Sequence, residues 1–72
     1  MNAHDRRLGS PAVLRYDTPD FEVIEPGSYV LCAVSGRRIA LQALRYWSPE
    51  LQEAYAGPEE VLARMRELGR AG

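Results

Sequence analysis

Short apolar runs separated by turn residues fill the first half of the chain. Three of them, residues 12–16, 21–24 and 29–32, have the β-branched and aromatic composition of strands. Residues 17–20 supply Asp, Thr and Pro between the first two runs. Residues 25–28 fit a type II turn, because proline presets one φ angle and glycine supplies the positive one. The pattern predicts an antiparallel hairpin followed by a third strand.

Alternation along these strands predicts which side chains enter the core. Side chains two residues apart lie on the same face of a strand. Phe21 and Val23 would share one face, as would Tyr29 and Leu31. We expect these four residues to be buried.

The middle of the chain has a second turn and a second predicted hairpin. Gly36 stands where a tight turn needs a residue that tolerates positive φ. Residues 39–41 and 44–47 would form the two arms of a small hairpin after this turn. Residues 40–44 have a composition that fits a helical turn equally well, and the sequence leaves this alternative open.

The last third of the chain has the start signals of two short helices. Ser48 is suited to cap free backbone N–H groups, and Pro49 suits the first helical position. Gly57 and Pro58 would end this first helix and open the second. The second helix has an apolar stripe formed by Val61, Leu62, Met65 and Leu68.

Composition and charge restrict the class of protein. Ten acidic residues against nine basic ones give a net charge of −1, so no excess of positive charge draws the whole chain to nucleic acid. No run approaches the roughly 18 apolar residues of a membrane span, and the first residues lack the apolar stretch of a signal peptide. We therefore expect a cytoplasmic protein that does not contact a membrane. The single cysteine excludes an intramolecular disulfide.

The segment Cys32-Ala-Val-Ser35-Gly36 has the outline of a zinc knuckle that has lost a ligand. A structural zinc site needs about four thiolate or imidazole ligands, usually arranged as two pairs with about two residues between the members of a pair. Serine takes the place of the second cysteine here.

The motifs that follow the knuckle resemble those of small treble-clef domains of the TRASH and YHS type. Those domains run Cys-Pro-x-Cys-Gly, a hairpin, Tyr-Phe-Cys-Ser-x-x-Cys, a short helix and a Pro-Glu-x-Tyr-Leu helix start. The segments 46–51 and 58–62 follow the same order here. On that pattern Trp47 and Leu51 take the third and fourth ligand positions. The resemblance implies a domain without metal or cofactor, in which apolar packing replaces coordination and four residues are structural: Cys32, Ser35, Trp47 and Leu51.

The amino-acid sequences of three segments are similar to those of a second family. Cys-Ala-Val-Ser-Gly, Leu-Arg-Tyr-Trp-Ser and Gln-Glu-Ala-Tyr-Ala resemble short, uncharacterised bacterial proteins, mainly alphaproteobacterial, that are grouped as a domain of unknown function. The resemblance covers about residues 12–68. It implies no activity and no catalytic or binding residue.

Together these elements predict an α+β fold of small antiparallel β-hairpins with a zinc-knuckle-like turn, followed by two short C-terminal helices. We expect one domain over residues 11–69, a disordered N-terminal tail over residues 1–10 and a frayed C-terminus over residues 70–72. A chain of 72 residues buries only about 60% of the surface that its unfolded form exposes. Its stability is therefore expected to be marginal.

Enzymatic chemistry has little support in the sequence. The only histidine, His4, lies in the predicted tail, so neither a Cys–His nor a Ser–His–Asp arrangement has an ordered base. A free cysteine such as Cys32 is among the most buried residue types. We expect no enzyme and no catalytic residue.

Four residues form the candidate interface: Arg37, Arg38, Arg45 and Tyr46. Arginine and tyrosine are enriched at binding hot spots, and no acid lies near the knuckle arginines in the sequence. Solvated surface arginines are the alternative. Trp47 is either a core residue or, beside Arg45, part of a stacking platform for single-stranded nucleic acid.

These observations favour a non-enzymatic protein-interaction module or accessory subunit. Its partner would be another protein or further copies of the same chain, because so small a domain often needs a partner to stabilise its fold. A nucleic-acid-binding module that uses the arginine-rich knuckle is the second hypothesis. A remnant of a metal-handling domain is the third.

Overall fold

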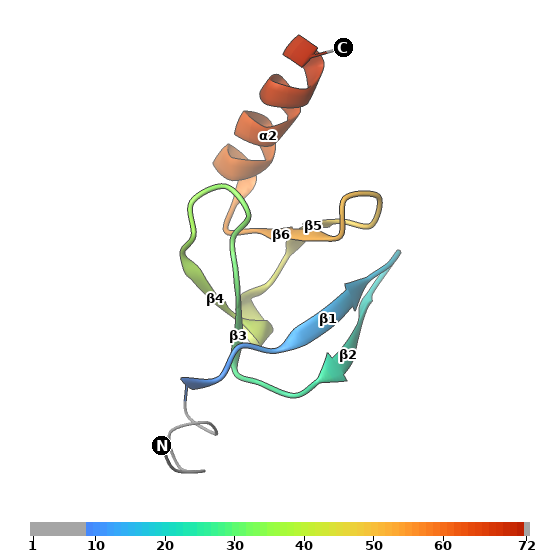
Figure 1. The fold of residues 1–72 in the computed structure, drawn as a ribbon, viewed down its shortest axis with the longest axis vertical. Helices are drawn as coiled ribbons and strands as arrows, with labels where there is room; N and C mark the ends of the chain where they lie inside the picture. Colours follow the sequence, from blue (N-terminus) through green and yellow to red (C-terminus); the bar gives the residue numbers. More distant parts are fainter. Residues whose placement is uncertain (1–8, 72) are drawn as a thin grey trace.

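Three two-stranded antiparallel sheets and a C-terminal helix make up the fold in the computed structural model, which describes residues 9–71 (Figure 1). The elements in chain order are β1 (Val13–Tyr16), β2 (Phe21–Glu25), β3 (Tyr29–Leu31), β4 (Arg38–Ala40), the 3-10 turn η1 (Leu41–Ala43), β5 (Tyr46–Ser48), β6 (Glu53–Tyr55) and α2 (Pro58–Ala71). The predicted α+β fold of small antiparallel hairpins is confirmed. The prediction of two C-terminal helices is wrong, because a single helix follows β6.

Isolated bridges join the three hairpins to one another. Pro11 pairs with Tyr29 in a parallel bridge, which connects the β1–β2 hairpin to β3. Cys32 pairs with Ala54 in the same way, which connects the end of β3 to β6. Gly27 allows the first of these junctions, since a Cβ at this position would lie 2.4 Å from the backbone nitrogen of Ala12. The predicted type II turn is therefore not the reason for this glycine, whose φ is not positive.

The predicted hairpin between residues 39–41 and 44–47 is wrong. Strand β4 pairs back with β3 across the knuckle, and β5 pairs forward with β6. Residues 41–43 form the turn η1, as the open alternative allowed, and this turn redirects the chain between β4 and β5.

The predicted helix at Ser48-Pro49 is replaced by a tight turn between β5 and β6. The Ser48 hydroxyl still accepts a hydrogen bond from the Leu51 backbone N–H at 3.1 Å, as a helix cap does. Gln52 then adopts a φ of 55°, which ends the helical turn. Its side-chain amide accepts from the Tyr16 N–H at 2.9 Å and donates to the Tyr16 carbonyl at 2.7 Å. These contacts with β1 stabilise the turn, so the predicted short helix does not form.

The core is small and lies where the three hairpins meet. Of the predicted core residues, Phe21 and Tyr29 are half-buried, while Val23 and Leu31 are exposed. The expected face of β3 is therefore wrong, because Val30 points inward instead. Among the described residues, Ser48 is a buried polar residue, and eight hydrophobic residues are buried: Ala12, Tyr16, Val30, Cys32, Ile39, Leu44, Ala54 and Tyr55.

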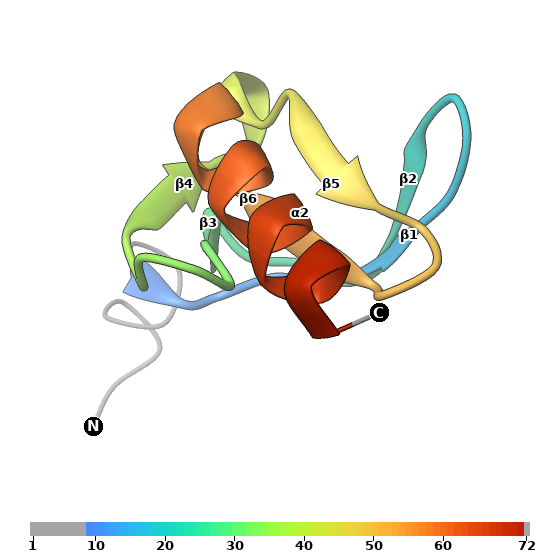
Figure 2. The ribbon, with the colours of Figure 1, turned by 90° about the horizontal axis from the view of Figure 1, so that it is seen from above.

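Helix α2 extends away from the hairpins along the long axis of the molecule (Figure 1). Seen from above, it lies over β6, with the β1–β2 hairpin to one side (Figure 2). The overall extents are 45 × 22 × 18 Å. Most of the predicted disordered tail, residues 1–8, and Gly72 of the predicted frayed end lie outside the described residues.

Candidate interaction surfaces

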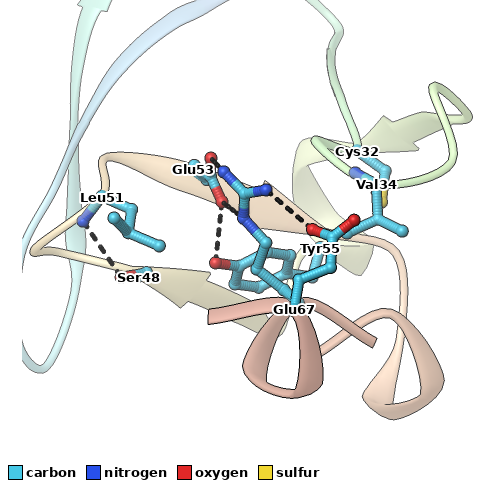
Figure 3. A network of polar contacts seen from close by, with 8 residues as sticks. Cys32, Val34, Ser48, Leu51, Glu53, Tyr55 and Glu67 are labelled. Atoms are coloured by element: carbon cyan, nitrogen blue, oxygen red, sulfur yellow. Dashed lines mark hydrogen bonds and ion pairs between the residues drawn. The ribbon is translucent and has the colours of Figure 1, made fainter. Parts of the chain in front are cut away.

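The knuckle between β3 and β4 is built around the sulfur of Cys32. The backbone N–H groups of Val34 and Ser35 both donate to Cys32 Sγ at 3.4 Å. The Gly36 N–H closes the turn on the Cys32 carbonyl at 2.9 Å, and Gly36 has the predicted positive φ, at 75°. Figure 3 shows Cys32 and Val34 beside the polar contacts of β6 and α2. The predicted turn at Gly36 thus forms, and it directs two backbone N–H groups at the sulfur of Cys32.

Hydrogen bonds set the ionisation of this thiol. Burial raises the pKa of Cys32, but hydrogen bonds from the Ser35 hydroxyl and from the N–H groups of Ser35, Ala56 and Val34 outweigh it, and the pKa is lowered overall. Cys32 is only 3% exposed. Among the described residues, no group of three or more histidine, cysteine, aspartate or glutamate side chains is placed to hold a metal ion.

Trp47, expected in a former ligand position, connects two hairpins instead of facing the knuckle. Its ring stacks on Tyr16, with centroids 6.4 Å apart, and meets Phe21 edge-on at 5.4 Å. Its Nε1–H donates to the Asp17 carbonyl at 2.7 Å. Leu51 is 38% exposed in the turn between β5 and β6. Strand β6 separates Trp47 from Cys32, because Ala54 pairs with both residues.

The four candidate interface residues lie on two different strands and the segments before them. Arg37 is exposed in the knuckle, and Arg38 begins β4. Arg45 lies just before β5 and Tyr46 begins that strand; both are exposed, and β5 does not pair with β4. The hairpin that would have brought the two pairs together does not form.

The two knuckle arginines are expected to differ in their effect on stability. The Arg38 guanidinium lies 4.6 Å from the centroid of the Tyr29 ring, a cation–π contact worth about 0.5–1 kcal/mol. Arg38→Ala should lower the free energy of unfolding by about that amount, and Arg37→Ala by less than about 0.5 kcal/mol. Urea denaturation of the two variants measures the difference. Equal losses would show that the ring contact contributes nothing.

A second cluster fastens α2 to β6. Arg64 donates two hydrogen bonds to the Glu53 carboxylate, from Nε to Oε1 at 3.1 Å and from Nη2 to Oε2 at 2.7 Å. Its Nη1 donates to Glu67 at 3.1 Å, and the buried Tyr55 hydroxyl donates to Glu53 at 2.9 Å (Figure 3). Planar, bidentate contacts of this kind fix the orientation of the groups they join. The cluster therefore sets the direction in which the helix leaves the body.

This cluster is expected to make the free energy of unfolding depend on pH in the alkaline range. Burial raises the pKa of Tyr55 above its ordinary value of 10.0, and the hydrogen bond to Glu53 raises it further. A group whose pKa is raised on folding stabilises the protein fully below its unfolded pKa and loses that contribution as the pH rises through the folded value. Stability should therefore fall above pH 10, and less steeply in Tyr55→Phe. Urea denaturation at a series of pH values tests this, and identical slopes would contradict it.

The third surface is an apolar face of α2 that is exposed to solvent. Leu62 is 59% exposed, Met65 47% and Leu68 41%. These three side chains, which we call the α2 stripe, follow one another at intervals of three residues along one side of the helix. The sequence predicted an apolar stripe of Val61, Leu62, Met65 and Leu68. Val61 is half-buried, whereas the other three side chains face solvent, which the sequence did not predict.

This arrangement of three bridged β-hairpins, a knuckle and one projecting helix defines a small α+β domain. A sequence profile of the family DUF2093, described as an uncharacterised protein conserved in bacteria, matches residues 23–64. The match covers more than half of the chain, so the chain belongs to this family and the expected uncharacterised bacterial family is confirmed. No curated protein and no solved structure matches the chain.

Within residues 9–71, no helix is long and apolar enough to cross a bilayer.

Proposed function

We propose that this chain is a cytoplasmic, non-enzymatic protein-interaction module or accessory subunit that docks through the α2 stripe. The observation that carries the proposal is the exposure of Leu62, Met65 and Leu68 on one side of a single helix. A surface helix of a globular protein normally turns its apolar stripe toward its own core. Contiguous exposed apolar side chains mark interaction sites more often than isolated ones do.

The way in which α2 is fastened supports this reading. Its side-chain hydrogen bonds to the rest of the described chain come from Arg64, in the middle of the helix, which binds Glu53 of β6. Beyond that point Arg66, Glu67, Leu68 and Gly69 are all exposed. Short helices are marginal in water, and most of their stability in proteins comes from packing of the amphipathic face. A partner on the stripe would supply that packing.

A pulldown with matched variants tests the proposal. The Leu62→Glu/Met65→Glu double variant places charges on the stripe. The Val23→Glu/Ile24→Glu variant is the control, because these β2 side chains are similarly exposed, at 47% and 54%. Partners recovered with the wild-type chain should be lost with the stripe variant and kept with the control, at unchanged circular dichroism. Full recovery by the stripe variant would refute the proposal.

A remnant of a metal-handling domain is the second candidate, and the knuckle favours it. The N–H groups that surround the Cys32 sulfur, followed by a hairpin and a helix, give a treble-clef-like order of elements. N–H donors around a thiolate suit a former zinc ligand, while serine at position 35 removes the second one. As a remnant, the purified chain should contain no zinc and keep its fold in a chelator. One zinc ion per chain that is lost in Cys32→Ser would instead show a working metal site.

A further inference from the structure

The outward side of α2 has the spacing of a helix–helix seam. Pro58, Leu62, Met65 and Gly69 are separated by four, three and four residues. This alternation places side chains in one line along a helix and is the spacing of coiled-coil seams. Leu62 lies two residues before Arg64, about 200° around the helix at 3.6 residues per turn. The seam therefore faces away from the Glu53 contact that fastens the helix to the body.

The two borders of this seam differ in chemistry. One border is apolar, with Val61 and Leu68. The other carries an acid at the start of the helix, Glu59, and a base two turns later, Arg66. Both side chains are exposed, and neither forms an ion pair with another described residue. The border is thus acidic at one end and basic at the other.

This charge order matches an antiparallel copy of itself. When two such helices pack antiparallel, Glu59 of each chain faces Arg66 of the partner subunit, so two opposite-charge pairs form around one two-fold axis. Parallel packing would set this border against the apolar border of the partner, so neither Glu59 nor Arg66 would meet an opposite charge. Antiparallel packing also sets each helix N-terminus beside the other's C-terminus, where the macrodipoles attract.

We infer that a second copy of this chain covers the α2 stripe, forming an antiparallel α2–α2 homodimer, an inference that rests on the proposed function and names its partner. Leu62 and Met65 form the apolar centre of the contact, Val61 and Leu68 close its apolar border, and the pair of Glu59 with Arg66 of the partner subunit fixes the direction. A 14-residue helix is about 21 Å long, so the contact lies at the small end of specific interfaces. We expect a dissociation constant of about 10–100 µM, as in transient complexes.

Sedimentation equilibrium of the full chain from about 1 µM to about 1 mM tests the dimer. The expected result is a mass that rises with concentration from 8.1 kDa toward twice that value. Met65→Glu should raise the dissociation constant by about a hundredfold, because it buries two charges at the centre of the contact. A mass of 8.1 kDa at every concentration would overturn the inference.

Charge exchange tests the direction of the helices. Glu59→Arg alone and Arg66→Glu alone should each weaken the dimer about tenfold, since each makes two like-charge pairs. An equimolar mixture of the two variants should recover the wild-type dissociation constant, which a variant that failed to fold would not do. Arg45→Glu, with the same change of charge outside the helix, is the control and should leave the dimer unchanged. Failure of the mixture to recover would overturn the antiparallel arrangement.

The two proposals fail in different ways. A wild-type chain that stays monomeric while its stripe variant loses partners in the pulldown would overturn the homodimer and leave the interaction module standing. A monomer whose stripe variant loses no partner would overturn both. Binding of the monomer to anionic lipid vesicles through Leu62 and Met65 would assign the stripe to a membrane surface and also overturn the homodimer.

Discussion

Trp47→Ala should lower the free energy of unfolding by about 3 kcal/mol. A domain of this size has about 4–11 kcal/mol in total, so the loss should reduce the melting temperature by roughly 12 °C or more. The reason is that Trp47 packs on Tyr16 and Phe21 of the β1–β2 hairpin while it pairs with Ala54 of β6. Removal of its ring leaves a gap where two hairpins meet. Urea and thermal denaturation measure the effect.

Two further variants show what Trp47 contributes. Trp47→Phe keeps an aromatic ring but loses the 2.7 Å hydrogen bond to Asp17, which should cost about 1 kcal/mol. Leu51→Ala removes a side chain that is 38% exposed and should cost less than about 1 kcal/mol. A Trp47→Ala variant no less stable than Leu51→Ala would show that the hairpins do not depend on this ring.

Glu53→Ala is expected to release α2 from the body. The variant leaves the buried Tyr55 hydroxyl without its carboxylate acceptor and should cost about 2–3 kcal/mol. It also removes both hydrogen bonds that Arg64 makes to β6. Amide hydrogens of α2 should therefore exchange faster, while those of β1 and β2 change little.

Glu67→Ala is the control for this experiment. Glu67 binds the same guanidinium within the helix, with a side chain that is 64% exposed. Its removal should cost less than about 0.5 kcal/mol and leave α2 attached. If Glu67→Ala and Glu53→Ala release the helix equally, the contact between helix and sheet is not what holds it.

Local signals in the sequence were sufficient for several elements. Gly36 identified the knuckle, because positive φ is a demand that few other residues meet. Asp17 to Asp20 identified the turn of the first hairpin, and Pro58 with Glu59 identified the start of α2. Each of these signals depends on one residue and its own backbone.

Features that depend on contacts between residues far apart in the chain could not be predicted from the sequence. All four residues from Tyr29 to Cys32 are apolar, so alternation alone does not decide which face of β3 is buried. Ser48 caps a turn as expected, but whether a helix follows depends on the contacts of Gln52 with Tyr16, far away in the sequence. The pattern of neighbouring residues carries no information about such contacts.

The candidate sites likewise combine features with a local sequence signal and features that depend on distant contacts. The α2 stripe was readable from periodicity, but its exposure depends on how Arg64 docks. Glu60, four residues before Arg64, is the partner that helix spacing favours. Arg64 instead binds Glu53, which offers both oxygens of a half-buried carboxylate. A pair eleven residues apart has no local signature.

Hydrogen exchange of α2 as a function of protein concentration tests the central claim that its stripe is a docking surface. Amides of residues 65–69 should exchange quickly at about 1 µM and slowly at about 1 mM in the wild-type chain, and quickly at both concentrations in Met65→Glu. Exchange of these amides that is slow at every concentration, in both the wild-type chain and the variant, would show that the helix needs no partner and contradict the account.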